Sequence, residues 1–370
     1  MRICLTGGHV TPALALIREL EKRGEKDLIF IGRQEMMEGD KTPSIEATLI
    51  PQTGVKFFAI HPGRLQRAFT RYTIPALIRT PLGFFESLTI LLRESPDVVV
   101  SFGGYVALPV VLAAWVLRIP ILTHEQTVVI GLANRIITFF ADRIAVSFES
   151  SLRYFPPKKV VLTGNPVRPE IFEVKSKRFE FTSRRPVLYF TAGNQGSHVL
   201  NTVVSEVLPQ LLEKYVVVHQ VGAAGIYDDY GELRLASQKL PEHLRRYYFL
   251  ERYIGPDDIG ALLGSSDLVI GRSGANTVAD LAARRVPALF IPLPFATHDE
   301  QTKNARMLVD AGSAEILPQR ELTPERLLAV IEMMMENIRK YKHAATEAKK
   351  LVRLDAAEKL ANEVTALAAR

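Results

Sequence analysis

The sequence predicts an α/β protein with two doubly wound, parallel-sheet domains. Short runs of β-branched residues alternate with apolar periods of helical length, which is typical of βαβ units. The order strand, glycine loop, helix occurs near the amino terminus and again after residue 186. The length of 370 residues also suits two domains. These observations together favour two Rossmann-like domains facing each other across a cleft.

The first domain opens with the clearest βαβ unit. Residues 3–6 predict a strand, and residues 13–23 predict a helix with Thr11 as N-cap, Pro12 at its first position and Gly24 after its end. The further elements expected here are strands at 27–31, 97–101 and 119–122 and a helix at 105–117.

A polar, basic stretch at 173–185 has no apolar period and predicts the connection between the domains. The pattern then restarts with strands at 187–191, 215–221, 267–271 and 288–292 and helices at 199–214, 275–284 and 301–311. The tail from Thr323 is helical, and residues 356–369 are amphipathic enough to pack on a domain surface. The organisation expected is residues 1–166, residues 167–345 and a terminal segment at 346–370.

Composition excludes several classes of protein. Apolar residues make up 47% of the chain and charged ones 23%, as in globular proteins, so a disordered or fibrous chain is excluded. The single cysteine, Cys4, cannot form an internal disulfide, and this favours the cytosol. No run reaches the roughly 18 apolar residues of a membrane span, and no export signal opens the sequence. The net charge of +6 suits an anionic partner.

Three glycine loops follow predicted strands, where helix N-termini offer free N–H groups to an anion. They are Thr6-Gly7-Gly8-His9, Ala192-Gly193-Asn194-Gln195-Gly196-Ser197 and Gly271-Arg272-Ser273-Gly274-Ala275. Each could also be a tight turn that binds nothing. Neither the P-loop pattern nor G-x-G-x-x-G is present, which argues against P-loop NTPases and dinucleotide dehydrogenases.

A polar segment at 297–305 would suit sugar or ribose hydroxyls, or could simply begin a helix. A metal site formed by its adjacent residues His298, Asp299 and Glu300 is disfavoured, because neighbours at a helix start point in different directions. We therefore expect no metal and no cofactor.

Five motifs in order resemble one family. They are FGGYV at 102–106, HEQ at 124–126, GNPVR at 164–168, RSGA at 272–275, and Gln301 with Asn304 and Ala305. Together they resemble the MurG family of UDP-N-acetylglucosamine transferases, which belong to glycosyltransferase family 28. The resemblance implies the GT-B fold, a C-terminal helix that packs back on the amino-terminal domain, and inverting transfer of N-acetylglucosamine.

The resemblance also implies which residues bind the donor. UDP-N-acetylglucosamine would contact the second domain, with Asp280 on the ribose and Glu300 and Gln301 on the sugar hydroxyls. The other donor-binding positions implied are Arg168, Gly193, Asn194, Gln195, Gly196, Ser273, Gly274, Ala275, Asn276 and Thr277.

The amino-terminal domain would bind a polyprenyl-diphosphate acceptor through Thr6, Gly7, Gly8, Tyr105, His124, Thr127 and Asn134. His9 is the candidate base, with Glu125 as a second catalytic candidate. Histidine titrates near neutrality, and the positive end of a helix favours the uncharged ring that a base requires. Alternatively, His9 only orients its loop. The first loop is shorter than the G-G-x-G-G-H form usual in the family.

Residues 61–93 combine five arginines and one acid with many apolar residues. The candidate membrane patch comprises Arg64, Arg67, Phe69, Arg71, Arg79, Phe84 and Phe85. The spacing of Ile74, Ile78, Leu82 and Phe85 also suits a helix that faces the core. Trp115 could join this patch or fill the sheet packing, and the packing is favoured.

The function expected is synthesis of the disaccharide lipid of peptidoglycan by a peripheral protein on the cytoplasmic face of the inner membrane. Its partners would be the UDP-sugar, the lipid-linked acceptor, the anionic membrane surface and other cell-wall synthesis proteins, but no nucleic acid. Three alternatives stay open: another GT-B glycolipid transferase, a UDP-sugar epimerase, and a non-catalytic nucleotide-sugar or lipid-binding relative.

Overall fold

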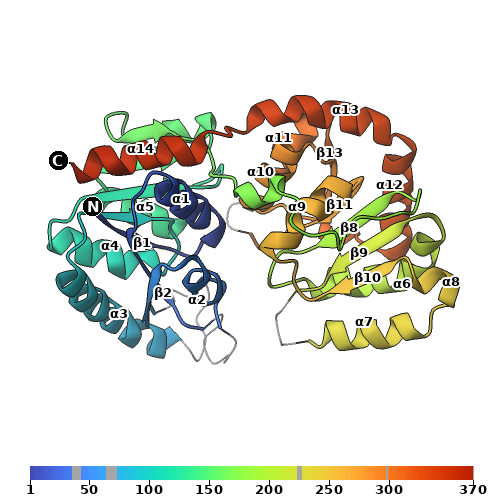
Figure 1. Cartoon of the computed structure of the whole chain (residues 1–370), viewed down its shortest axis with the longest axis horizontal. Coiled ribbons are helices and arrows are strands. Elements are labelled where there is room, and N and C mark those ends of the chain that lie inside the picture. Colours follow the sequence, from blue (N-terminus) through green and yellow to red (C-terminus); the bar gives the residue numbers. More distant parts are fainter. Residues whose placement is uncertain (36–42, 64–72, 223–226, 297–298, 370) are drawn as a thin grey trace. The chain divides into compact units, whose positions relative to one another are not determined.

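The computed structural model describes residues 1–35, 43–63, 73–222, 227–296 and 299–369, with the side chains of 73–80 left out. The chain divides into two compact units, each with its own parallel sheet (Figure 1). Unit 1 comprises Met1–Arg168 and Arg353–Arg370, and unit 2 comprises Pro169–Val352. The boundary after Arg168 falls two residues beyond the expected one, and residues 346–352 pack with unit 2.

The sheet of unit 1 has seven strands in the order β3-β2-β1-β4-β5-β6-β7. Leu5 pairs with Phe30 on one side and with Val100 on the other, and every strand pair is parallel. The strands are β1 (Arg2–Thr6), β2 (Asp27–Arg33), β3 (Lys56–Ile60), β4 (Val98–Ser101), β5 (Ile121–Glu125), β6 (Arg143–Val146) and β7 (Val160–Leu162).

Helices cover both faces of this sheet, and alternate residues of β1 show why. Ile3 and Leu5 pack in the cluster that includes α1 and α14, whereas Cys4 packs in the cluster beneath α3, α4 and α5. The helices are α1 (Val10–Lys22), α2 (Ile45–Leu49), α3 (Thr73–Glu94), α4 (Ala107–Val116), α5 (Leu132–Phe140) and α14 (Ala356–Ala368). The terminal helix α14 lies against α1 (Figure 1).

Helix α1 begins earlier than the sequence predicted. Its N-cap is His9, and Pro12 is its third residue. The prediction of Thr11 as N-cap was therefore wrong. Proline is compatible with this position, because the first-turn N–H groups have no partner within the helix.

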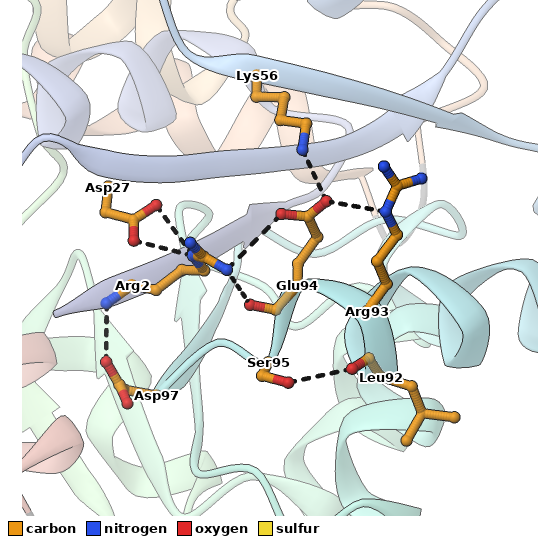
Figure 2. A network of polar contacts seen from close by, with 8 residues as sticks. All are labelled: Arg2, Asp27, Lys56, Leu92, Arg93, Glu94, Ser95 and Asp97. Atoms are coloured by element: carbon orange, nitrogen blue, oxygen red, sulfur yellow. Dashed lines mark hydrogen bonds and ion pairs between the residues drawn. The ribbon is translucent and has the colours of Figure 1, made fainter.

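Charged residues are paired along the amino edge of this sheet (Figure 2). The buried carboxylate of Glu94 lies 2.7 Å from Lys56 Nζ and 3.8 Å from Arg2 Nη1. Arg2 Nε also contacts Asp27 at 2.9 Å, and the Arg2 backbone N–H donates to Asp97 at 2.7 Å. These contacts join the starts of β1, β2, β3 and β4 to the end of α3.

The sheet of unit 2 has six parallel strands in the order β10-β9-β8-β11-β12-β13. They are β8 (Val187–Thr191), β9 (Val216–Gln220), β10 (Tyr248–Glu251), β11 (Leu268–Gly271), β12 (Ala288–Phe290) and β13 (Ala314–Ile316). Residues 173–185, expected to connect the domains, instead belong to unit 2, where Phe179 is fully buried.

Helices surround this second sheet on both faces, and α6 and α12 pack together on its central core cluster. The helices are α6 (His198–Lys214), α7 (Asp229–Gln238), α8 (Glu242–Arg245), α9 (Pro256–Ser265), α10 (Ala275–Arg284), α11 (Glu300–Asp310), α12 (Pro324–Glu336) and α13 (Ile338–Ala348). Short 3₁₀ turns occupy Pro51–Thr53, Glu149–Tyr154, Pro169–Phe172, Gln319–Glu321 and Lys349–Leu351.

Candidate active site

Both sheets reverse their strand order at one point, and the glycine loops lie there. In unit 1 the reversal is between β1 and β4, and in unit 2 between β8 and β11. Ligands of open α/β sheets bind at this point, beyond the carboxyl ends of the strands. The structure therefore places all three sequence-predicted loops, together with residues 102–105, where binding is expected.

In unit 1 the loops after β1 and β4 are bonded to each other. The Phe102 N–H donates to Thr6 O at 2.7 Å, and the Gly8 N–H donates to Gly103 O at 3.1 Å. Gly7 has a φ of +136°, and a Cβ there would lie 2.9 Å from the Phe102 backbone. Only glycine permits this conformation and this approach. Thr6 is buried, and its Oγ1 has no hydrogen-bond partner among the described residues.

His9 is half-buried at the start of α1, and its Nδ1 lies 2.9 Å from Phe102 O. A carbonyl oxygen can only accept, so Nδ1 must carry the hydrogen of this bond. In the neutral ring the lone pair then resides on Nε2. This tautomer suits a general base, and the same bond also orients the loop, so the geometry is compatible with both sequence interpretations.

Behind His9, the same carbonyl contacts Gln126, which in turn bonds His124. Gln126 Nε2 lies 3.4 Å from Phe102 O and 3.1 Å from His124 Nδ1, and His124 Nε2 donates to Gly164 O at 3.0 Å. Burial lowers the pKa of His124 to about 4, so its ring is neutral at pH 7. His124, predicted to bind the acceptor, is fully buried and connects β5 to the segment after β7.

Glu125 is buried at the end of β5, and its carboxylate accepts several hydrogen bonds. Oε1 accepts from the N–H and hydroxyl of Thr127 at 3.1 and 2.8 Å, and Oε2 accepts from Asn134 Nδ2 at 2.7 Å and from the Gly131 N–H at 3.4 Å. In this conformation Glu125 fixes the loop that leads into α5. Its assignment as a catalytic residue stays a prediction.

Asn134 is held against the loop that follows β4. A Cβ on Gly103, whose φ is +70°, would lie 2.3 Å from Asn134 Oδ1, and that buried oxygen has no hydrogen-bond partner among the described residues. Tyr105 is fixed by Arg33, whose Nη1 donates to its hydroxyl at 2.5 Å and whose Nε contacts Glu46 at 2.9 Å. Sequence reasoning missed Arg33, a cation at the carboxyl end of β2.

In unit 2 the loop after β8 presents two glycines with positive φ, Gly193 at +70° and Gly196 at +82°. A Cβ on Gly196 would lie 1.9 Å from Val221 O, so the backbones touch there. Gln220 Nε2 donates to Gly193 O at 3.0 Å. Asn194 is half-buried and Gln195 is exposed, so the loop offers backbone and side-chain groups to a ligand.

Arg272, directly after β11, connects this loop to its neighbours. Its Nη2 donates to Ser197 Oγ at 2.8 Å and to Gln319 Oε1 at 2.6 Å, and its Nη1 donates to Ile291 O at 2.8 Å. Burial lowers the pKa of Arg272 to about 10, and the guanidinium remains charged at pH 7. Sequence reasoning used Arg272 only as part of a motif, because its partners come from three distant segments.

The N-terminus of α10 has no side-chain cap. Its N-cap is Gly274, which has no side chain that could cap the first turn of Ala275, Asn276 and Thr277. Such an end favours an anion. Ser273 Oγ donates to Gln301 O at 2.8 Å, and Gln301 Oε1 accepts from the Leu293 N–H at 2.9 Å. The structure thus brings Ser273 and Gln301 together.

The remaining donor-site predictions are distributed as follows. Asp280 is buried in the middle of α10, and Glu300 is the first residue of α11. Arg168 ends the first segment of unit 1. His298 lies outside the described residues. Among the residues that are described, no group of three or more His, Cys, Asp or Glu side chains could hold a metal ion.

The structure describes only some residues of the candidate membrane patch. Arg64, Arg67, Phe69 and Arg71 lie outside the described residues, as does the side chain of Arg79. Phe84 packs partly against the core, while Phe85 is 61% exposed and Leu82 is 47% exposed, so these last two do not face the core. The expectation that Trp115 fills the sheet packing was wrong, because it is 55% exposed. None of the described helices is long and apolar enough to cross a bilayer.

Comparisons with known proteins agree along the whole chain. Residues 3–146 match the glycosyltransferase family 28 N-terminal domain, and residues 187–360 match the glycosyltransferase family 28 C-terminal domain. The UDP-N-acetylglucosamine--N-acetylmuramyl-(pentapeptide) pyrophosphoryl-undecaprenol N-acetylglucosamine transferase of Desulforudis audaxviator is 36% identical over 379 residues, covering 97% of each chain. The transferase of the same name from Lactococcus lactis subsp. lactis is 34% identical, covering 98% of this chain and 99% of its own.

A solved structure shares the fold. The MurG of Acinetobacter baumannii superimposes with a TM-score of 0.69 over 99% of each chain, at 24% sequence identity. This likeness confirms the expected GT-B arrangement of two parallel-sheet domains as the fold class.

Proposed function

The chain belongs to glycosyltransferase family 28, and from that membership we infer that it transfers N-acetylglucosamine from UDP-N-acetylglucosamine to the muramyl sugar of a polyprenyl-diphosphate-linked acceptor. The observation that carries this inference is the 36% identity over 97% of the chain to a transferase named for that reaction. The product is the disaccharide lipid from which peptidoglycan is made.

The carboxyl edge of the unit 2 sheet is our proposed donor site. The amides of Asn194, Gln195 and Gly196 and the start of α10 would bind the diphosphate, because both present N–H groups to an anion. The Gly193 N–H already donates to Thr191 Oγ1 at 3.2 Å, so Gly193 would contribute through its positive φ. Asp280 would bond the ribose, and Glu300 and Gln301 would bond the sugar hydroxyls. Arg272 donates hydrogen bonds to three segments and so fixes the positions of the two diphosphate-binding loops relative to each other.

The carboxyl edge of the unit 1 sheet is our proposed acceptor site, with His9 as the base. Nε2 of His9 would take the proton from the C4 hydroxyl of the muramyl sugar as its oxygen attacks the anomeric carbon. The bond from that carbon to the UDP oxygen breaks, and the configuration inverts. Negative charge then collects on the UDP diphosphate, where the amides and the α10 N-terminus stabilise it.

Glu125 supports this site indirectly. Its contacts are with Thr127, Gly131 and Asn134, and Asn134 packs on Gly103. We therefore propose Glu125 as a positioning residue that fixes the loop beside Tyr105. No divalent cation is needed in this scheme, because backbone amides and helix N-termini meet the leaving group.

Attachment to a membrane surface would occur through helices α3, α4 and α5, which pack side by side in unit 1. Their exposed apolar side chains are Leu82, Phe85, Leu92, Trp115, Val116 and Phe139. Arg93, Arg118 and Arg135 are exposed on or beside the same helices. An apolar surface with basic neighbours favours an anionic leaflet, each basic group contributing about 1 kcal/mol near the surface.

A transfer assay tests the function. Radiolabelled UDP-N-acetylglucosamine is incubated with the chain and a muramyl-lipid acceptor, with and without EDTA, and labelled lipid is counted. We expect label in the lipid under both conditions. Donor binding without label in the lipid would support the non-catalytic alternative. Conversion of the donor to its epimer without acceptor would support the epimerase. A need for added Mg²⁺ would overturn the metal-free scheme.

A further inference from the structure

Unit 2 contains a cavity of about 480 Å³ at the amino end of β11, on the edge of the sheet opposite the proposed donor site. Ser266 lies in its wall, two residues before the strand begins at Leu268. Arg272 follows the other end of the strand, at the edge of the sheet where the donor loops lie. The cavity lies between the last turns of α9, α10 and α13. It is therefore separate from the loops assigned to the UDP-sugar.

The lining of this cavity is strongly basic. Four cationic side chains line it, Arg284, Arg285, Lys342 and Lys349, and none of the lining residues is acidic. The C-termini of α9, α10 and α13 beside it carry about half a negative charge each, and Asp267 pairs with Lys342, so together these groups do not offset the four cations. An excess of positive potential therefore remains in the cavity.

Protein groups compensate these cations incompletely. Lys342 pairs with Asp267, and Arg284 Nη2 donates to Gly260 O at 3.3 Å. The Nε of Arg284 is buried without a hydrogen-bond partner among the described residues. Arg285 is exposed and Lys349 is half-buried, and neither forms an ion pair with any described residue. Buried polar groups in native proteins are almost always satisfied, so the unpartnered Nε of Arg284 indicates a missing acceptor, and the two unpaired cations beside it favour an anionic one.

The cavity also restricts the shape of that partner. Phe172, Leu263 and Val286 form an apolar part of the wall, and the guanidinium of Arg284 lies 6.0 Å from the centre of the Phe172 ring. Phe172 thus limits the directions from which Arg284 can be approached. The volume admits a small molecule and excludes a folded protein segment.

We propose that this cavity binds a small polyanion of the phosphate class, with Arg285 and Lys349 as the contacts that the ligand completes. Such a ligand would supply the negative charge that the four cations lack. The site does not depend on the transferase activity inferred above, because it lies on the other edge of the unit 2 sheet.

The test is calorimetric titration of the full chain with inorganic tripolyphosphate in the presence of saturating UDP, which occupies the donor site. The variant Arg285→Asn with Lys349→Ser removes the two unpaired cations. Asparagine suits position 285, where φ is +60°. The matched control is Arg326→Asn with Lys350→Ser, which loses the same charge on exposed residues outside the cavity.

We expect tripolyphosphate to bind the wild-type chain and the control equally, and the cavity variant at least about tenfold more weakly. The proposal would be overturned if tripolyphosphate gave no heat of binding with the wild-type chain. It would also be overturned if the affinity for tripolyphosphate fell equally in the cavity variant and the control. A second arm measures sedimentation with phosphatidylglycerol vesicles. Weaker sedimentation of the cavity variant alone would identify a lipid headgroup as the source of the phosphate. Unchanged sedimentation with weaker tripolyphosphate binding would identify a free phosphate compound.

Discussion

The two edges of the unit 1 sheet differ in whether their polar groups have partners. At the amino edge, Arg2, Asp27, Lys56 and Glu94 are paired with one another (Figure 2). At the carboxyl edge, oxygens of Thr6, Gln126 and Asn134 are buried without a hydrogen-bond partner among the described residues. The backbone there also has positive φ at Gly7, Gly103 and Gly104.

Within this one sheet, the amino edge contributes to stability, and the carboxyl edge is the proposed site of function. A folded chain normally satisfies its buried polar groups, and the amino edge does so. Unsatisfied buried groups cost stability, and they persist where a ligand or a reaction uses them. We therefore propose the carboxyl edge as the functional edge, and changes at the two edges should be distinguishable by experiment.

The largest effect should come from His9→Ala. Loss of a general base should lower the transfer rate by about 100-fold or more, while the affinity for UDP-N-acetylglucosamine stays nearly the same. Single-turnover transfer and donor titration measure the two quantities.

The variant His9→Asn separates catalysis from loop orientation. Its amide nitrogen takes the place of Nδ1 and can still donate to Phe102 O, but it cannot accept a proton at neutral pH. We expect it to be as slow as the alanine variant. Recovery of the wild-type rate would make His9 a structural residue and remove the base from the mechanism.

A pH effect should follow from His124. Its folded-state pKa of about 4 lies below the unfolded value near 6.5, so the unfolded chain binds more protons between these values. The free energy of unfolding of unit 1 should therefore be highest above pH 6.5. It should decrease by up to about 3 kcal/mol as the pH drops towards 4.

Trp115, the only tryptophan, lies in unit 1, so its fluorescence during urea unfolding reports this unit. Between pH 4 and 6.5 the free energy of unfolding should change with pH less steeply in His124→Asn than in wild type, by the slope that one proton contributes. An identical slope in both proteins would contradict the burial of a neutral ring.

A smaller effect should come from Gly103→Ala. The new methyl group would meet Asn134 Oδ1 at 2.3 Å, so Asn134 must leave Glu125, and we expect about 2 kcal/mol of destabilisation with reduced transfer. The matched control is Gly104→Ala, where φ is similar but the nearest atom is 3.6 Å away. Urea unfolding compares them, and equal losses would mean that backbone strain alone explains both.

The smallest effect should come from the amino edge. Glu94→Gln removes the shared partner of Arg2 and Lys56, but these cations are partly exposed and screened, so about 1 kcal/mol should be lost. Transfer by the folded enzyme should stay within about twofold of wild type. Asp27→Asn, at a more exposed position, serves as control and should cost less. A large loss of activity in Glu94→Gln would contradict the proposal that only the carboxyl edge serves function.

Much of the fold could be predicted because periodicity and glycine punctuation are local signals. The strand at Val187–Thr191 and the helix at Ala275–Arg284 have the expected limits. The helix start at His9 could not be found, because Thr-Pro offers an equally good local signal two residues later. The stretch 173–185 resembles a linker in composition, and only its long-range burial of Phe179 places it in unit 2.

The site was partly predictable for the same reason. Glycine loops and motif order mark the carboxyl ends of β1, β8 and β11. Sequence cannot show that Arg272 reaches Ser197 and Gln319, or that Arg33 holds Tyr105, because these contacts join segments far apart in the chain. Nor could it distinguish the buried, neutral His124 from the half-buried His9.

The most direct test of the account is a crystal structure of the chain with bound UDP-N-acetylglucosamine. We predict the diphosphate within hydrogen-bond distance of the amides at residues 194–197 and at the start of α10. A diphosphate bound elsewhere, such as beside Arg284 and Arg285 at the amino end of β11, would contradict the assignment of donor binding to the carboxyl edge.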